Sequence, residues 1–101
     1  MARNEADEIV TRNGQVVRRF IDAWAAKDVD ACMACLSPEI LYINQPLEPV
    51  VGLSNVRKII KGILDLTNKV EWKLSNVFGR GNTVCTERLD CWELRREGLE
   101  R

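Results

Sequence analysis

The stretch VEWKLSNVFGRGNTVCTERLDCWE, residues 70–93, decides the fold. Apolar and polar residues alternate from Val70 to Ser75, and extending this alternation to Phe78 predicts a strand with one largely apolar face. That face is expected to carry Val70, Trp72, Leu74, Asn76 and Phe78. The following GRGN, residues 79–82, is typical of a tight hairpin turn, so TVCTERLDCWE is predicted to return as an antiparallel strand.

Charged side chains interrupt this return strand. Strand alternation places Arg88 and Asp90 on one face, together with Val84, Thr86 and Trp92. Burying an ion pair in an apolar cavity carries a large desolvation cost, so such a pair is a poor device for stability alone and points to function. An exposed face with an ordinary surface salt bridge explains the pattern equally well. Alternation alone leaves both interpretations open.

Helical patterns precede the hairpin. Apolar residues between positions 9 and 24 recur on one stripe, which predicts an amphipathic helix that is firmer beyond Gly14. A shorter helix is predicted over residues 29–36 and ends at Ser37-Pro38. Ser54 is positioned as the N-cap of a third helix, which carries apolar residues as far as position 64.

One more strand is predicted between the second and third helices. EILYIN, Glu39–Asn44, has Tyr42 and Asn44 on one face and is ended by Pro46, and LEPVVG, residues 47–52, reads as a loop. Helices therefore come first and most strands later. This order predicts an α+β domain in which N-terminal helices pack on one side of an antiparallel sheet.

Composition narrows the function classes. With 101 residues, 46% hydrophobic and 30% charged, the chain is expected to fold as one small domain. Fifteen basic residues balance fifteen acidic ones, which argues against nucleic acid or a membrane as a partner. Because no apolar run resembles a membrane span or a signal peptide, a cytoplasmic location is expected. Histidine is absent, which excludes Ser-His-Asp and Cys-His catalysis and imidazole metal sites.

The four cysteines suggest a metal or redox site, but their spacing and their neighbouring residues argue against it. Cys32 and Cys35 form a CxxC motif, but within VDACMACL they fall among apolar residues at helical spacing, which indicates small core residues. Cys85 and Cys91 are six positions apart instead of forming a second CxxC, and they are poorly placed to pair with each other on one strand face. No metal site is predicted.

Two short motifs resemble those of a known family. YINQP, Tyr42–Pro46, with Gly52 just beyond it, and TERLD, Thr86–Asp90, resemble the limonene-1,2-epoxide hydrolase family. The order of elements and the spacing between the motifs match over nearly the whole chain. That family has a cone-shaped, cystatin-like α+β fold with a curved antiparallel sheet, which nuclear transport factor 2 and polyketide cyclases share.

The resemblance implies a cofactor-independent, one-step addition of water to a small apolar, terpene-like epoxide, which gives a vicinal diol. Carried over to this chain, Asp90 is the general acid that protonates the epoxide oxygen, and Arg88 bridges it to a second aspartate. Tyr42 and Asn44 help to hold the attacking water. Proton donation during ring opening accelerates such a step by about 10²–10⁴-fold.

The candidate residues for the walls of the substrate pocket are chosen by strand alternation alone. An apolar cavity suits a terpene-like substrate and strengthens the electrostatic interactions inside it. The candidate wall residues are Leu74, Phe78 and Trp92.

The family's second aspartate, which acts as the base, lies on a later strand than these residues reach. The resemblance therefore implies one domain over residues 1–101, incomplete at its C-terminal end, with the last strands missing and little hydrolase activity. Two alternatives use the same fold. One is a non-catalytic ligand-binding or dimerising module, which an open sheet edge favours. The other is a polyketide-cyclase-like isomerase. Homodimerisation is common on this fold and stays open.

Overall fold

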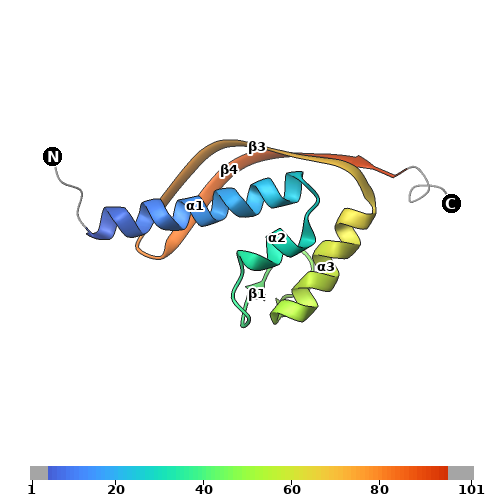
Figure 1. The fold of residues 1–101 in the computed structure, drawn as a ribbon, viewed down its shortest axis with the longest axis horizontal. Helices are drawn as coiled ribbons and strands as arrows, with labels where there is room; N and C mark the ends of the chain where they lie inside the picture. The colour runs from blue at the N-terminus through green and yellow to red at the C-terminus, as the bar shows by residue number, and fades with distance from the viewer. Residues whose placement is uncertain (1–4, 96–101) are drawn as a thin grey trace.

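The computed structural model describes residues 5–95. Its longest elements are the helix α1 (Glu5–Ala25) and the strands β3 (Thr67–Arg80) and β4 (Thr83–Leu94), and α1 runs along the hairpin that the two strands form (Figure 1). The shorter elements that lie between them in sequence are α2 (Val29–Ala34), β1 (Leu41–Tyr42), β2 (Val50–Val51) and α3 (Leu53–Asp65).

The strands form two antiparallel ladders, one of β1 with β2 and one of β3 with β4. The helices and β1 lie on one side of the β3–β4 hairpin, which curves over them (Figure 1). This arrangement confirms the predicted α+β class, with helices packed on a curved antiparallel sheet. Within residues 5–95, no helix is both long enough and apolar enough to cross a membrane.

The hairpin turn is where the sequence placed it. Gly81 and Asn82 connect the strands, and Gly81 has a φ of 58°, which a glycine at the first central position of a tight turn adopts without strain. Gly79 is needed for a different reason. A Cβ built on Gly79 would lie 2.6 Å from the carbonyl oxygen of Thr83 and 3.4 Å from Cγ1 of Val10, so only glycine allows the strands and α1 to approach this closely.

A bulge interrupts β3 halfway along the hairpin. The ladder pairs Leu74 with Arg88 and then Asn76 with Glu87, so Ser75 is the extra residue. Asn76 Nδ2 donates a hydrogen bond to Oε1 of Glu87 over 3.0 Å, which shows that these two side chains share one face. Beyond the bulge, the residues of β3 therefore point to the opposite side from the one that simple alternation predicts.

Phe78 is displaced by this bulge. It pairs with Cys85 and is 52% exposed, whereas Val77 pairs with Thr86 on the side of the hairpin that carries Leu74. The prediction that Asn76 and Phe78 share a face with Leu74 is wrong, because the predicted alternation contained no inserted residue.

The core lies where the helices meet the base of the hairpin, and its centre is aromatic. Trp24 of α1 is 1% exposed and stacks on Trp72 of β3, with ring centroids 4.7 Å apart and planes 27° apart. Trp92 of β4 meets both rings edge-on, at 5.7 and 5.9 Å. Because aromatic side chains bury the most area, this cluster ties α1 to both strands. The other members of the buried core are Ala23, Cys32, Met33, Val56, Ile60, Leu64 and Val70.

The segment between α2 and α3 departs from the prediction. The strand expected over Glu39–Asn44 is reduced to the two residues of β1, and its partner β2 lies within the predicted loop 47–52. The predicted N-cap, Ser54, lies inside α3, which begins one residue earlier. Gly52 occupies the cap position with a φ of 91° and no side-chain hydrogen bond, because the turn out of β2 needs a conformation that glycine adopts easily.

The cysteine environments agree with packing roles. Cys32 is fully buried in the core, and all four cysteines are free thiols. Burial, followed by the nearby Cys35 and Asp28, raises the pKa of Cys32 to about 11. A thiol with so high a pKa carries little of the reactive thiolate at neutral pH.

We expect Gly79→Ala to lower the free energy of unfolding by about 1–3 kcal/mol, because the added methyl group would clash with the carbonyl oxygen of Thr83. Gly62→Ala in α3 is the matched control. Nothing lies within 4 Å of its Cβ position, so it should raise the free energy of unfolding by up to about 1 kcal/mol through helix propensity. Urea denaturation measures both, and equal effects of the two changes would contradict the close approach at Gly79.

We also expect the thiols to react in a fixed order with a thiol-specific reagent at pH about 8. Exposed Cys85 should react first, and Cys32 should react only as the chain unfolds, because it is buried and its pKa is raised to about 11. Cys85→Ser should remove the fast phase. Rapid labelling of Cys32 in the folded chain, identified by peptide mass, would contradict this order.

Candidate active site

The two charged residues of β4 form an ion pair on the side of the hairpin that faces the helices. Arg88 Nε donates to Oδ1 of Asp90 over 2.7 Å, and Arg88 Nη2 donates to Oδ2 over 3.4 Å. The carboxylate therefore receives the guanidinium through both of its oxygens, in the two-pronged geometry that orients such pairs most firmly. Because residues two apart in a strand share a face, β4 itself sets this pairing.

Two further side chains hold Arg88 in place. Its Nη1 donates to Oγ1 of Thr86 over 3.3 Å, from one position earlier on the same face of β4. Its Cζ lies 4.1 Å from the ring centroid of Trp72, within the range of a cation–π interaction. The guanidinium is thus fixed by a carboxylate, a hydroxyl and an aromatic ring, and the last of these belongs to the core.

The ion pair is only partly removed from solvent. Both side chains keep 32% of their surface exposed. At this exposure the pair avoids the full desolvation cost of a buried one and contributes modestly to stability. The structure therefore lies between the two interpretations that the sequence left open, because the pair faces the helical side of the sheet and solvent still reaches it.

Tyr42 lies on β1 and is linked to the ion pair through the charge of Arg88. Its side chain is half-buried and packs against the hydrophobic core. Burial raises the pKa of Tyr42 above its ordinary value, and the positive charge of Arg88 opposes that rise. The charge of Arg88 thus acts on the Tyr42 hydroxyl, which links the two motifs electrostatically.

Asn44 lies in the loop that follows β1. It is exposed, and together with Tyr42 it lines a hollow of about 260 Å³ beside β2 and α3. Arg88 and Asp90 are not among the residues that line this hollow, whereas Tyr42 lines it and is influenced by the charge of Arg88. The remaining lining residues are Leu47, Glu48, Pro49, Val50 and Ile59.

The structure separates the three predicted wall residues. Leu74 pairs with Arg88 across the ladder, and Trp92 lies two positions beyond Asp90, so both share the face of the ion pair. Leu74 is half-buried and Trp92 is 38% exposed. Phe78 lies on the outer face because of the bulge, which removes it from this pocket.

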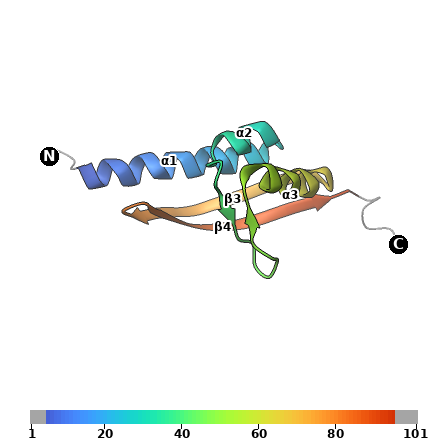
Figure 2. The same ribbon diagram turned by 90° about the horizontal axis from the view of Figure 1, so that it is seen from below.

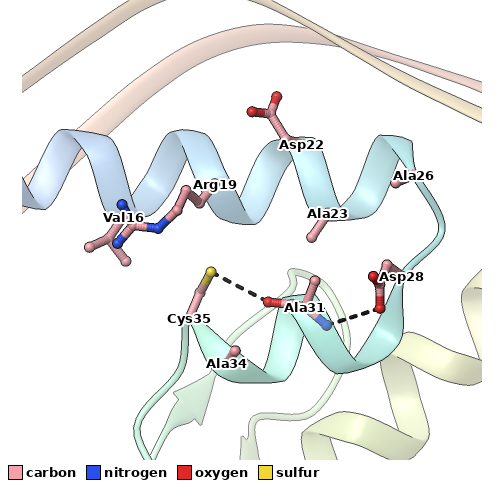
Figure 3. Close-up of a pocket in the computed structure, with 9 residues that line it drawn as sticks. All are labelled: Val16, Arg19, Asp22, Ala23, Ala26, Asp28, Ala31, Ala34 and Cys35. Atoms are coloured by element: carbon pink, nitrogen blue, oxygen red, sulfur yellow. Dashed lines mark hydrogen bonds between the residues drawn. The ribbon is translucent and has the colours of Figure 1, made fainter.

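A larger hollow lies between α1 and α2, with a volume of about 640 Å³ (Figure 3). Small side chains, including Ala23 and Ala31, form its floor, and Arg19 and Asp22 come from α1. Cys35 lies at its edge, where Sγ donates to the carbonyl oxygen of Ala31 over 3.5 Å. None of its lining residues belongs to the ion-pair site, so its size does not bear on the chemistry there.

Two residues of the site were not identified as such from the sequence. Thr86 was placed on the correct face by alternation, but nothing in its type indicated a hydrogen bond to Arg88. Trp72 was assigned to the apolar face, although its contact with the guanidinium makes it part of the charged site. The register between the two strands supplies the missing signal, since Trp72 lies directly opposite Asp90.

Comparison with known families gives this geometry a context. The sequence profile of the SnoaL-like domain matches residues 17–99. The chain belongs to the SnoaL-like domain family. The matched range includes the ion pair, Tyr42, Asn44 and the C-terminal part of α1. Among curated proteins, none matches this SnoaL-like chain.

Solved structures share the fold of this SnoaL-like domain at low sequence identity. An LEH-like epoxide hydrolase from M. tuberculosis superposes with a TM-score of 0.75 at 22% identity, over 84% of this chain and 63% of that one. A cystatin-fold protein from Novosphingobium aromaticivorans gives a TM-score of 0.70 at 16% identity, over 77% and 68%. A candidate dehydratase of the NTF2-like family from Streptomyces avermitilis gives 0.61 at 12%, over 87% and 91%. These similarities establish the NTF2-like fold.

We expect the sole tyrosine to report the charge of Arg88. Its phenolate absorbance should titrate above the ordinary pKa of about 10, and Arg88→Met should raise the pKa further by removing a charge that favours the phenolate. Arg57→Met, which breaks the ion pair with Asp30, is the control and should leave the pKa of Tyr42 unchanged. A pKa of Tyr42 that stays the same in the Arg88→Met variant would contradict an electrostatic influence of Arg88 on Tyr42.

The titration of Tyr42 should also appear in the pH dependence of the free energy of unfolding. Because the folded state holds the phenolic proton of Tyr42 more tightly than the unfolded state, its contribution is present below pH about 10 and is lost as the pH rises through the higher folded value. Tyr42→Phe should remove this part of the alkaline destabilisation.

Proposed function

We propose that this SnoaL-like domain is a cofactor-independent epoxide hydrolase, which adds water to a small apolar epoxide and gives a vicinal diol. The observation that carries the proposal is the Arg88–Asp90 ion pair, which is held against Trp72 on the helical side of the sheet and influences the Tyr42 hydroxyl. Fold similarity alone would not support it, because the same fold serves many functions.

Each residue of the site has a role in this reaction. A water oxygen forms a bond to a ring carbon while the bond between that carbon and the ring oxygen breaks. Asp90, as its acid form, gives a proton to the ring oxygen, and Arg88 orients the Asp90 carboxyl group. Tyr42 and Asn44, which line one hollow, hold the water. Positioning the water removes part of the entropic cost of the addition.

Apolar side chains next to the ion pair suit such a substrate. Leu74 and Trp92 share its face, and the hollow at Tyr42 adds Leu47, Val50 and Ile59. A hydrocarbon skeleton gains from contact with these residues, while the ring oxygen is directed to the polar end. The LEH-like epoxide hydrolase among the structural neighbours supports this assignment only through the shared fold.

The reaction also requires a base that takes a proton from the water. Within residues 5–95, Asp90 is the carboxylate that forms an ion pair with Arg88. One carboxylate cannot give a proton to the ring oxygen and accept one from the water in the same step, so the proposed reaction needs a second acceptor.

Diol formation from limonene-1,2-epoxide by purified chain of confirmed mass tests the proposal, and its rate is expected to be low for residues 1–101 because the reaction needs a second proton acceptor. Asp90→Asn should lower the rate at least about 100-fold, because an amide cannot donate the proton that ring opening needs. Asp30→Asn is the matched control, since Asp30 is exposed and pairs with Arg57 on the helical layer. Diol formation by folded Asp90→Asn at the rate of the unchanged chain would remove Asp90 from the mechanism. Absence of diol from the unchanged folded chain, at every protein concentration tested, would reject hydrolysis of this substrate.

A further inference from the structure

The hollow between α1 and α2, which Figure 2 shows on the side of the helices away from the hairpin, has the size and lining of a small-molecule site. Its volume of about 640 Å³ falls within the range of such sites in proteins. Ala23 of α1 is buried on its floor, and Ala31 of α2 and Val16 of α1 are half-buried. Ala26 and Ala34 also line it. Because both helices carry alanines here, space remains between them that longer side chains would fill.

The floor of the hollow favours hydrocarbon over hydrogen-bonding groups. The backbone N–H of Ala31 donates to Oδ1 of Asp28 over 3.0 Å, and the carbonyl oxygen of Ala31 accepts from Sγ of Cys35 over 3.5 Å (Figure 3). These polar atoms at the centre of the floor are therefore already used. An amide or hydroxyl group placed there would lose its hydrogen bonds to water without replacement, whereas methylene groups would gain from contact with the alanines.

Opposite charges lie at the two ends of this floor. Figure 3 shows the guanidinium of Arg19 at the end beside Val16 and the carboxylate of Asp28 at the other end, where α2 begins. Both residues are exposed. Within residues 5–95, Arg19 forms no hydrogen bond or ion pair, and the carboxylate of Asp28 accepts through Oδ1 only, so its Oδ2 stays available.

The separation of these charges sets the length of the ligand. From Arg19 to the end of α1 at Ala25 the helix advances by about 9 Å at 1.5 Å per residue, and Asp28 lies beyond that end. A ligand that meets both charges therefore carries its own charges several carbon atoms apart. Asp22 also lines the hollow, but Figure 3 shows its carboxylate directed away from α2, so it does not change this arrangement.

We propose that the hollow between α1 and α2 is a second ligand site, which binds a small zwitterion whose ammonium and carboxylate groups stand at opposite ends of a hydrocarbon chain, as in an ω-amino acid. The ligand carboxylate pairs with Arg19, and the ligand ammonium group donates to Oδ2 of Asp28. The chain between them covers Ala23 and Ala31. None of these residues belongs to the ion-pair site, so the proposal is independent of the hydrolase function.

Two isomers test the separation of the charges. We expect 6-aminohexanoate to give saturable shifts in the amide NMR signals of Ala23 and Ala31 in the folded chain. The isomer 2-aminohexanoate has the same composition but carries both charges at one end, so it should bind at least about threefold more weakly. Hexanoate and hexylamine, which keep one charge each, should also bind more weakly. Equal binding of the two isomers, or no saturable shift with 6-aminohexanoate up to about 50 mM, would overturn the proposal.

Charge variants test the two ends separately. Arg19→Met and Asp28→Ser should each weaken the binding of 6-aminohexanoate about three- to tenfold, because each removes one partner of the ligand. Serine can still accept the hydrogen bond from the N–H of Ala31, so the second change removes the charge and keeps the helix cap. Arg18→Met and Asp30→Asn are matched controls that should leave binding unchanged, since neither residue lines the hollow. Undiminished binding by folded Arg19→Met or Asp28→Ser would contradict the assigned contacts.

Labelling of Cys35 locates the bound ligand. Because its thiol lies at the edge of the hollow, bound 6-aminohexanoate should slow the reaction of Cys35 with a thiol-specific reagent and leave that of Cys85, on the hairpin, unchanged. Ala31→Leu should fill the floor and weaken binding at least about tenfold, whereas Ala25→Leu, at an exposed position outside the hollow, should not. Saturable shifts without protection of Cys35, or full binding by folded Ala31→Leu, would place the ligand elsewhere and overturn the site.

Discussion

The stacking of Trp24 on Trp72 is the contact on which the rest of the structure depends. It joins α1 to the hairpin at the centre of the core, and Trp92 closes the cluster from β4. Trp72 also contacts the guanidinium of Arg88. One ring therefore belongs to both the core and the charged site. The packing of the helices on the sheet thus helps to set the position of the ion pair.

The candidate site combines a rigid part with a less regular one. Thr86, Arg88 and Asp90 alternate along a single strand, which fixes their spacing through the backbone ladder. Tyr42 and Asn44 come from the short β1 and the loop that follows it, where only two residues are paired. Such a division allows the loop to adjust its position while Arg88 and Asp90 stay in place.

The sequence predicted the elements that depend on strong local signals. The hairpin followed from alternation and from the glycines of its turn, and the face of Arg88 and Asp90 followed from the period of a strand. The Ser75 bulge and the start of α3 could not be predicted in this way, because each depends on how distant segments meet. The polar Ser75-Asn76 pair followed by Val77 was the available hint. The contact of Arg88 with Trp72 required the register of the two strands.

Because of the bulge at Ser75, a one-residue deletion in β3 would change which side chains face α1. Deleting that one residue would rotate the whole turn-proximal half of the strand by half a revolution. Phe78 would then move toward α1, and the small Val77 and Gly79 would turn to solvent, although α1 now approaches Gly79 through Val10. One residue gained or lost here would exchange two complete side-chain surfaces at once, whereas a substitution changes a single side chain.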